Sequence, residues 1–486
     1  MSGQPLYTAV QVRELDRRAI EDYGIDGYTL MCRAGRAVLG AVRARFPEAR
    51  RLLVCCGGGN NGGDGYVVAR LAEAAGLQVG VYAQSPPERL SGDARRAYRD
   101  WKSGGGSLVE SPEAEAVDVI VDALLGTGLD REVRDDYAAL IGRINAAGPP
   151  VIAVDVPSGL SADTGMPLGT AVRADVTVTF IGRKRGLETG RAADFVGELR
   201  FDALQTPESI HQGMVPDAWR VDADFPAEVL PLRMPSTHKG DLGHVLVCGG
   251  DHGMSGACLL AARASLVAGS GLVSVATRGA HAAILAAALP EAMWSDGEDG
   301  DRLDALVARA DTIALGPGLG RSEWSRSVVQ RLFRYDGPLV VDADALNLLA
   351  ESPLKRDEWV LTPHPGEAAR LLDCGVDEIQ GDRFAAVREI AARYRAVAVL
   401  KGAGSLIADA DGEVAVCPFG TPAMATAGMG DALTGVIASL LGQGVPAYPA
   451  ACAGVVLHAR AGEAAAAGRR SILAGELIDA LSRVLP

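Results

Sequence analysis

The chain has 486 residues, of which 48% are hydrophobic and 22% are charged. This length suits two α/β domains of ordinary size, and this composition excludes a disordered or fibrous chain. The 47 basic and 61 acidic residues give a net charge of −14, and no run of five or six basic residues occurs. We therefore expect no nucleic-acid partner and no membrane partner.

The start of the chain and its cysteines indicate a cytoplasmic protein. The first nine residues lack the basic and apolar segments of a secretory signal, and the longest apolar stretches are interrupted by Arg263, Arg278 or glycines. None of the eight cysteines shows C-x-x-C spacing, and several lie in strand-like runs, as Cys55 and Cys56 do. Buried, reduced thiols therefore explain them better than a zinc site.

Strands and helices alternate in the first half of the chain. Thr8 followed by Gln11 predicts a capping box that begins a helix through Ala19 and Glu21, and residues 30–45 predict a second helix. Short β-branched runs, separated by helical segments, then predict strands at 52–56, 77–82, 117–121, 151–154 and 176–180. This pattern is typical of a three-layer α/β sandwich, in which helices cover both faces of a parallel sheet.

A second alternation follows a proline-rich segment. Prolines recur between residues 206 and 236, which predicts a linker and two domains, 1–222 and 223–486. The predicted strands of the second domain are 244–248, 272–276, 312–315, 339–341, 359–361 and 397–400. Helices predicted at 429–441, 448–467 and 474–484 complete a second α/β domain.

A glycine-rich segment, residues 57–65, follows the first of these strands and opens a helix. Backbone N–H groups at such a helix start favour a phosphate. The G-x-G-x-x-G match is weak alone, because the next strand ends without an acid for a ribose hydroxyl, and a tight turn packed with glycines is the alternative. The polar side chains of Asn60, Asn61 and Asp64 favour a ligand site.

Two further acids, Asp122 and Asp155, follow neighbouring predicted strands and converge on the same edge of the sheet. Clustered carboxylates need a cation or a proton. Oxygen donors from Asn61, Asp122 and Ser158 suit a hard ion. Lys184 is the alternative source of charge, or an acid/base partner of Asp155, unless it is a surface side chain.

The motifs at 60–65, 122–128 and 155–159 resemble the N-terminal epimerase domain of NAD(P)H-hydrate repair enzymes, over about residues 8 to 215. The resemblance implies a Rossmann-like fold that interconverts the R and S epimers at C6 of hydrated NADH or NADPH. It implies potassium held by Asn61, Asp122 and Ser158, and catalysis by Asp155 with Lys184 beside it. The implied dinucleotide contacts are Asn60, Asn61, Gly62, Gly63, Asp64, Gly126, Thr127, Gly128, Leu129, Asp130, Arg131, Glu132, Tyr137 and Asp155.

A second pair of glycine-containing motifs lies at 401–405 and 428–431. The first wraps an anion with backbone amides, a lysine and a hydroxyl, although the chain contains no Walker loop. The second opens a helix with amides that suit a transferring phosphoryl group, and its Asp431 is placed to accept a hydroxyl proton. The alternative for Asp431 is a helix cap.

Together with 237–240, 316–320 and 362–367, these motifs resemble the C-terminal, ribokinase-like dehydratase domain of the same enzymes, over about residues 225 to 486. The resemblance implies that the S hydrate loses water while ADP becomes AMP and phosphate, with Mg²⁺ neutralising the phosphates. The residues that the resemblance implies for nucleotide binding are Lys401, Gly402, Ala403, Gly404, Ser405 and Gly430. Hydrate binding falls to Ala257, Gly318, Gly320, His364 and Asp431, although His364 is alternatively a loop residue at a proline-defined helix start.

Two other functions stay open at the level of sequence. The second domain is alternatively a ribokinase-type small-molecule kinase, with Asp431 in the same role. The first domain is alternatively a dinucleotide-binding module without turnover. A homo-oligomer is expected under the repair-enzyme hypothesis, with hydrated NADH or NADPH and ADP as the small-molecule partners.

Overall fold

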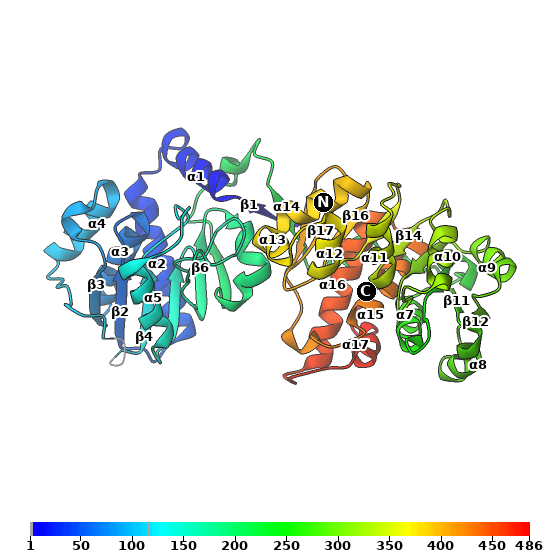
Figure 1. The fold of residues 1–486 in the computed structure, drawn as a ribbon. Helices are drawn as coiled ribbons and strands as arrows, with labels where there is room; N and C mark the ends of the chain where they lie inside the picture. Colours follow the sequence, from blue (N-terminus) through cyan, green and yellow to red (C-terminus); the bar gives the residue numbers. More distant parts are fainter. Residues whose placement is uncertain (1–2, 114–116) are drawn as a thin grey trace. The chain divides into compact units, whose positions relative to one another are not determined.

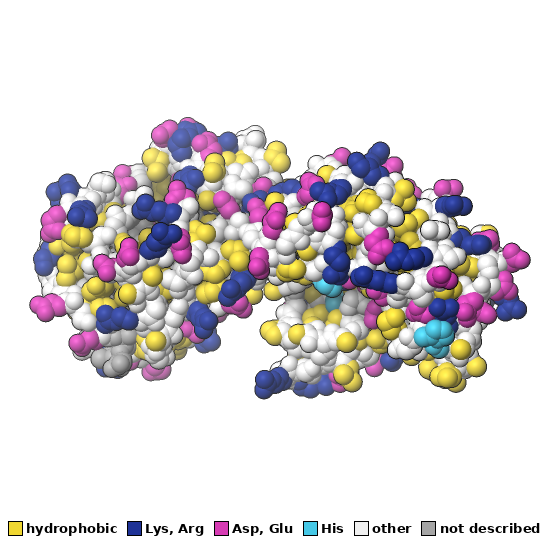
Figure 2. Space-filling view, in the orientation of Figure 1, with side chains coloured by type: hydrophobic (Ala, Val, Ile, Leu, Met, Phe, Trp, Pro, Cys, Tyr) yellow, Lys and Arg dark blue, Asp and Glu magenta, His cyan; other side chains and the backbone are white. Residues whose placement is uncertain are grey.

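Parallel sheets organise both halves of the chain (Figure 1). The structure is a computed structural model that describes residues 3–113 and 117–486, so residues 1–2 of the predicted first domain lie outside it. The chain divides into an N-terminal unit, Pro5–Ala218, and a C-terminal unit, Trp219–Pro486, which also takes in the first residues up to Gln4. Basic and acidic side chains are interspersed over the face shown in Figure 2.

The N-terminal unit contains a six-stranded sheet in the order β3-β2-β4-β5-β6-β8, and every neighbouring pair is parallel. Its strands are β2 (Arg51–Cys56), β3 (Gln78–Ala83), β4 (Val119–Ala123), β5 (Val151–Val154), β6 (Val176–Phe180) and β8 (Glu198–Asp202). A short pair, β1 (Gln4–Tyr7) and β7 (Arg183–Lys184), lies outside this sheet. The predicted strands are confirmed to within two residues.

Helices cover both faces of this sheet, as predicted. In β2, Leu52 and Val54 pack with α2 (Gly27–Arg45), α3 (Asn60–Ala74) and α4 (Gly92–Ser103). Leu53 and Cys55 point to the opposite face and pack with α5 (Asp135–Ala146). Because successive strand residues alternate between faces, one apolar strand builds two hydrophobic layers. The three-layer sandwich is thereby confirmed.

The first helix, α1 (Ala9–Arg17), begins at the predicted capping box. Thr8 Oγ1 accepts a hydrogen bond from Gln11 N at 3.2 Å, and Gln11 Oε1 accepts one from Thr8 N at 3.0 Å. The α-helix is shorter than predicted, because a π-helical turn, Arg18–Asp22, replaces its last turn. The cap fixes where α1 starts and thus which of its side chains face the sheet.

The C-terminal unit contains strands in the order β12-β11-β10-β13-β14-β15-β16-β17-β18. Neighbours are parallel as far as β16, and β17 and β18 then add as antiparallel strands. The bounds are β10 (His244–Cys248), β11 (Leu272–Thr277), β12 (Met293–Asp296), β13 (Thr312–Leu315), β14 (Leu339–Val341), β15 (Trp359–Leu361), β16 (Val397–Leu400), β17 (Ser405–Ala408) and β18 (Val414–Cys417). The sequence did not predict β12, β17 or β18.

Two helical layers enclose this second sheet. The layer that forms the largest apolar core consists of α7 (Ser255–Val267), α15 (Met429–Gly442), α16 (Ala447–Ala466) and α17 (Ala474–Leu481). The other helices are α8 (Gly279–Ala288), α9 (Gly300–Val307), α10 (Glu323–Leu332), α11 (Ala343–Glu351), α12 (Pro365–Leu372), α13 (Val376–Gly381) and α14 (Arg383–Tyr394). None of the helices in the described ranges is long and apolar enough to cross a membrane.

The proline-rich segment predicted as a linker is partly ordered into regular structure. Its strand β9 (Ala218–Arg220) pairs with β18 through Trp219 and Arg220. Its short helix α6 (Phe225–Val229) buries Phe225 in the core of the C-terminal unit. Strand β9 has three residues and helix α6 has five, so neither is long enough to show a periodic pattern of apolar residues in the sequence.

Candidate active sites

The first site begins at the glycine-rich turn between β2 and α3. A Cβ on Gly57 would lie 1.8 Å from the carbonyl oxygen of Leu124, and one on Gly62 would lie 2.1 Å from that of Gly57. Only glycine therefore lets the turn approach the end of β4 this closely. Gly59 is the N-cap of α3, so the positive end of that helix opens at the carboxyl edge of the sheet.

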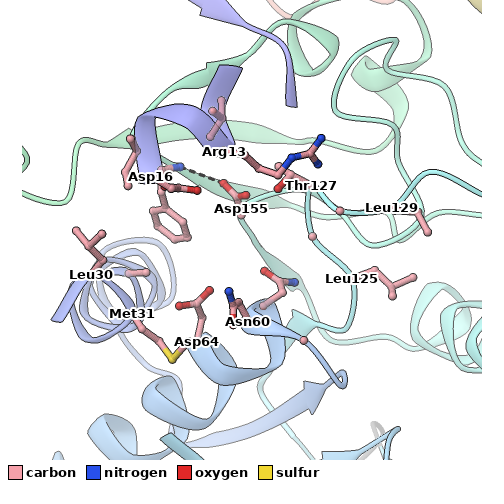
Figure 3. Close-up of a pocket in the computed structure, with 18 of the residues that line it drawn as sticks. Arg13, Asp16, Leu30, Met31, Asn60, Asp64, Leu125, Thr127, Leu129 and Asp155 are labelled. Atoms are coloured by element: carbon pink, nitrogen blue, oxygen red, sulfur yellow. Dashed lines mark hydrogen bonds between the residues drawn. The ribbon is translucent and has the colours of Figure 1, made fainter. Parts of the chain in front are cut away.

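A cavity of about 650 Å³ lies at this edge (Figure 3). Most of the predicted dinucleotide contacts line it: Asn60, Asn61, Asp64, Gly126, Thr127, Gly128, Leu129, Asp130, Arg131, Tyr137 and Asp155. Gly62 and Gly63 do not, because they are buried inside the first turns of α3. Glu132 is also outside the lining and pairs with Arg134 at 2.6 Å. The structure therefore brings the separate motifs together around one space.

Asp155 lies directly after β5. Its backbone is in the left-handed region, and only one of its two carboxylate oxygens accepts hydrogen bonds from described residues. Its φ of +66° lies in the left-handed region, which is uncommon for a residue with a side chain and occurs at functional sites. Its Oδ1 accepts hydrogen bonds from the Lys184 ammonium, from Thr179 Oγ1 at 3.2 Å and from Phe180 N at 3.2 Å. No described residue donates to Oδ2, so that oxygen remains available to a ligand.

Lys184 is buried, which rules out the surface alternative. Its side chain is 1% exposed, and its Nζ contacts Asp155, Thr179 Oγ1 at 3.0 Å and the Phe180 carbonyl at 2.9 Å. These contacts occupy all three of its N–H donors. Lys184 thus fixes the orientation of the Asp155 carboxylate, and the sequence signal for this was its place among five lysines in a chain rich in arginine.

Four more carboxyls line the cavity, those of Asp16, Asp64, Asp93 and Asp130, and the sequence analysis missed Asp16 on α1 and Asp93 on α4. Burial, with a contribution from the Asp155 carboxylate, raises the pKa of Asp16 to about 6 against the influence of Lys184. Burial, Asp155 and Asp16 raise the pKa of Asp64 well above its usual range. The site thereby holds two acids with raised pKa values beside a carboxylate that is paired with an ammonium.

The predicted metal ligands lie around a buried carboxylate at the base of this site. Asp122 is fully buried and accepts hydrogen bonds from Ser158 N at 2.8 Å and Ser158 Oγ at 2.6 Å. Burial raises its pKa to about 6, despite the hydrogen bonds from Ser158. The side-chain amide of Asn61 has a buried nitrogen without a partner among the described residues. These groups offer oxygen donors and an incompletely compensated charge.

The second site is built at the start of α15. Gly428 has a φ of +90°, and a Cβ there would lie 2.6 Å from Leu260 Cδ1. Asp431 follows in the first turn but accepts no hydrogen bond as a helix cap, so the capping alternative is wrong. Burial, then the neighbouring Asp342 carboxylate, raise the pKa of Asp431 to about 6, and Lys401 acts in the opposite direction.

Lys401 holds a positive charge at the same helix start. Its Nζ lies 2.7 Å from Asp342 Oδ1 and 3.7 Å from Glu367 Oε2. Burial opposes both charges, but the attraction between them lowers the pKa of Asp342 and raises that of Lys401. A Cβ on Gly430 would lie 3.3 Å from this Nζ. An ammonium and a helix N-terminus thus meet at one point, an arrangement that favours an anion.

The remaining predicted residues take several positions. A Cβ on Gly318 would lie 2.9 Å from Ala257 Cβ, so these two belong to one surface, and the Gly320 N–H is held by Asp344 at 2.9 Å. Ser405 Oγ donates to Gly402 O at 3.0 Å and closes the turn that contains Ala403 and Gly404. His364 caps α12 through Nδ1, which accepts from Gly366 N at 3.0 Å, and its half-exposed ring reaches Glu367 through Nε2.

The sequence analysis did not name Asp342, and it assigned no role to Glu367 although Glu367 ends the 362–367 motif. Asp342 Oδ2 also accepts a hydrogen bond from Thr434 Oγ1 at 2.8 Å, which links the carboxyl end of β14 to α15. A signal was present, because Asp342 directly follows a predicted strand, as Asp155 does.

Two family models match the chain in the two units. One, described as NAD(P)H-hydrate dehydratase, matches residues 245–483, and one described as YjeF-related protein N-terminus matches residues 27–186. The bifunctional NAD(P)H-hydrate repair enzyme Nnr of Coxiella burnetii is 47% identical over 484 residues, which cover 99% of each chain. This chain belongs to the family of bifunctional NAD(P)H-hydrate repair enzymes.

Other relatives of this repair-enzyme family extend the comparison. The Escherichia coli enzyme of the same name is 44% identical over 484 residues, covering 99% of this chain and 94% of its own. Among solved structures, a ribokinase-like superfamily protein of Enterococcus faecalis has a TM-score of 0.53 at 28% identity and covers 55% of this chain and 95% of that one. The predicted ribokinase-like fold is thereby confirmed.

Proposed function

We propose that this chain repairs hydrated NADH and NADPH with two activities. The N-terminal unit interconverts the R and S hydrates at C6, and the C-terminal unit dehydrates the S hydrate to NADH or NADPH while ADP becomes AMP and phosphate. The observation that carries the proposal is the match, over 99% of the chain, to bifunctional repair enzymes. One chain with both activities clears both epimers of the damaged cofactor.

In the epimerase site, Asp155 is the proposed acid–base group. The free Oδ2 faces the cavity, and Lys184 holds Oδ1. The glycine-rich turn and residues 126–131 supply amides and small residues that fit the dinucleotide, and Tyr137 lines the same cavity. The left-handed backbone of Asp155 supports this assignment, because strained residues of this kind occur at functional sites and this one lines the cavity.

Potassium is proposed beside Asp122. Among the described residues, no cationic side chain pairs with this buried carboxylate. Further oxygen donors are Ser158 Oγ, the Leu125 carbonyl and the Asn61 amide, turned so that its oxygen faces inward. A bound potassium ion would neutralise Asp122 and fix the loops at 124–128 and 157–159 that border the cavity. Hard oxygen donors without Cys or His suit this class of ion.

In the dehydratase site, Asp431 is proposed to accept the proton of the C6 hydroxyl as that oxygen attacks the β-phosphorus of ADP. AMP leaves, and the ring nitrogen then expels phosphate from C6 and loss of a C5 proton restores the reduced nicotinamide. Lys401, the 402–405 turn and the N-terminus of α15 hold the phosphate charge. Mg²⁺ bound with ADP supplies further charge neutralisation.

The proposed hydrate contacts in this unit are Ala257, Gly318, Gly320, His364 and Asp431. Gly318, Gly320 and His364 lie on the segments that follow β13 and β15, whereas Ala257 and Asp431 lie in the first turns of α7 and α15. The kinase alternative is not favoured, because the match to repair enzymes covers both units. The cytoplasm is the proposed location, since the eight free cysteines suit a reducing compartment. A homo-oligomer is also proposed, as expected under the repair-enzyme hypothesis.

Product analysis tests this function. Purified chain is incubated with hydrated NADH, ADP and Mg²⁺, and the products are separated by chromatography. The proposal predicts equal amounts of NADH, AMP and free phosphate, and none of these above background with Asp431→Asn. A stable phosphorylated product without NADH would favour the kinase instead.

A further inference from the structure

Asp16 is a cavity-facing carboxyl to which the proposed mechanism assigns no role. It lies on α1 four residues after the buried Val12 and directly after the buried Leu15, which places it at the edge of the helix face that packs on the unit. It lines the cavity together with Val12 and Ile20. Among the described residues it forms no hydrogen bond and no ion pair. Asp16 is half-buried, and a carboxyl that is partly withdrawn from water without a partner is costly unless it is protonated or meets a ligand.

Asp16 lies beside Asp155. Figure 3 shows the two side chains together at one end of the cavity, whereas Asp64 and Asn60 point in from the opposite side. The Lys184 ammonium is bound to Asp155, so the two carboxyls share a single positive charge. In such a pair one carboxyl retains its proton while the other is ionised. Since Asp155 has the direct ion pair with Lys184, Asp16 is the member of the pair that is placed to carry a proton.

We propose that Asp16 is the proton donor that works with Asp155 in epimerisation at C6, an inference that rests on the proposed epimerase function. C6 of the hydrate carries both the hydroxyl oxygen and the ring nitrogen. The groups that exchange protons with these two atoms must therefore lie side by side, as Asp16 and Asp155 do. Asp64 points into the cavity from the opposite side, so it does not meet this requirement.

The step opens and recloses the ring. Asp155 Oδ2 takes the hydroxyl proton, the bond between C6 and the ring nitrogen breaks with its electron pair moving to nitrogen, and Asp16 gives its proton to that nitrogen. The aldehyde so formed turns about the C5–C6 bond, and the nitrogen attacks its other face. Asp16 then takes the proton back from nitrogen, and Asp155 returns its proton to oxygen, so both acids end in their starting states.

The charged environment of Asp16 sets the expected pH dependence. The ionisable side chains that share the cavity with it are Arg13, Asp64, Asp93, Asp130, Arg131, Tyr137, Asp155 and Lys184. Because the donor must be protonated, epimerase activity falls as the pH rises through the pKa of Asp16. Asp16→Asn is expected to remove this decline of epimerase activity at high pH. If the role of Asp16 were purely structural, the decline would remain.

The test follows the near-ultraviolet absorbance of reduced nicotinamide after the full chain is mixed with R and S hydrates, ADP and Mg²⁺. Consumption of the S hydrate gives a fast phase from the dehydratase, and conversion of the R hydrate gives a slow phase from the epimerase. We expect Asp16→Asn to slow the second phase by about 10²- to 10⁴-fold, to the limit set by spontaneous epimerisation, with the fast phase unchanged. Asp16→Glu recovers part of the rate.

Glu14→Gln is the matched control, since Glu14 lies on the same helix but pairs with Arg17 and Arg18 outside the cavity. Its slow phase is expected to equal that of the wild type. The inference is overturned if Asp16→Asn epimerises at the wild-type rate, or if it retains the decline at high pH. It is also overturned if Asp16→Glu, with an unchanged thermal unfolding midpoint, is as slow as Asp16→Asn.

The ring-opening step has its own test. In water enriched in heavy oxygen and without ADP, ring opening preserves the original oxygen at C6, as read by mass spectrometry of the hydrate. Oxygen exchange in step with epimerisation would overturn it. A wild-type chain with a fast phase but no slow phase above the spontaneous rate would instead remove the epimerase function itself, so the two failures are distinguishable.

Discussion

The ammonium of Lys401 lies 2.7 Å from Oδ1 of the buried Asp342, and this pair joins the end of β16 to the end of β14 beneath the start of α15. Asp342→Asn would leave the Lys401 charge buried with Glu367 as its remaining carboxylate at 3.7 Å. Breaking a buried pair in this way costs about 3–5 kcal/mol. We therefore expect a lower unfolding midpoint for the C-terminal unit and loss of dehydratase activity. An unchanged midpoint in calorimetry would contradict the structural role of the pair.

The same pair predicts how stability depends on pH. The pKa of Asp342 is lowered in the folded state, so its contribution is present above its unfolded-state pKa and is lost as the pH falls through the folded value. The pKa of Lys401 is raised, so its contribution is present below its unfolded-state pKa and is lost as the pH rises through the folded value. Urea unfolding at a series of pH values measures the free energy of unfolding, which is expected to be greatest between the pKa of Asp342 and that of Lys401. Asp342→Asn is expected to flatten its acid side.

Dehydratase activity is expected to fall in acid because of Asp431. Its pKa is raised to about 6, and it must be ionised to accept the hydroxyl proton. The rate of the fast phase with the S hydrate is therefore expected to decline as the pH falls through about 6. Asp431→Asn removes the activity, whereas Asp479→Asn, which changes an exposed acid paired with Arg263, leaves it intact. A pH-independent rate down to pH ~4 would contradict the assignment of Asp431 as the base.

Epimerase activity is expected to depend on Lys184 through Asp155. Lys184→Met removes the ammonium that holds Asp155 Oδ1 and leaves the carboxylate with the donors of Thr179 and Phe180. We expect the slow phase to fall by about 10²-fold or more with the fast phase preserved. Arg183→Gln is the control, since that neighbouring cation pairs with Glu188 instead. Equal slow phases in Lys184→Met and wild type would show that Asp155 needs no positioning.

Potassium is expected to activate the epimerase alone. After exchange into buffer with a large organic cation, the slow phase should weaken and recover when potassium is added, while the fast phase should stay constant. Asp122→Asn should abolish this recovery, because it removes the buried carboxylate that the ion would neutralise. Potassium activation that survives Asp122→Asn would place the ion elsewhere.

The strand-helix alternation was enough to predict the layers of both units and the edge at which each site lies. Asp155 and Asp431 were predictable because each follows a strand or opens a helix within a glycine-rich motif. Asp16 was not, because it lies on a helix about 140 residues before Asp155 and only the packing of α1 brings the two together. The hairpin of β17 and β18 was missed, although its strands of four residues each are as long as several that were predicted.

The most direct test of the account is the extent of NADH recovery from a mixture of R and S hydrates supplied with ADP, Mg²⁺ and potassium. The account predicts complete recovery in two phases by the wild-type chain. It predicts recovery of only the initial S fraction by Asp155→Asn, apart from slow spontaneous epimerisation, and no recovery by Asp431→Asn. Recovery by the wild type that stops at the S fraction, or complete and rapid recovery by Asp155→Asn, would contradict it.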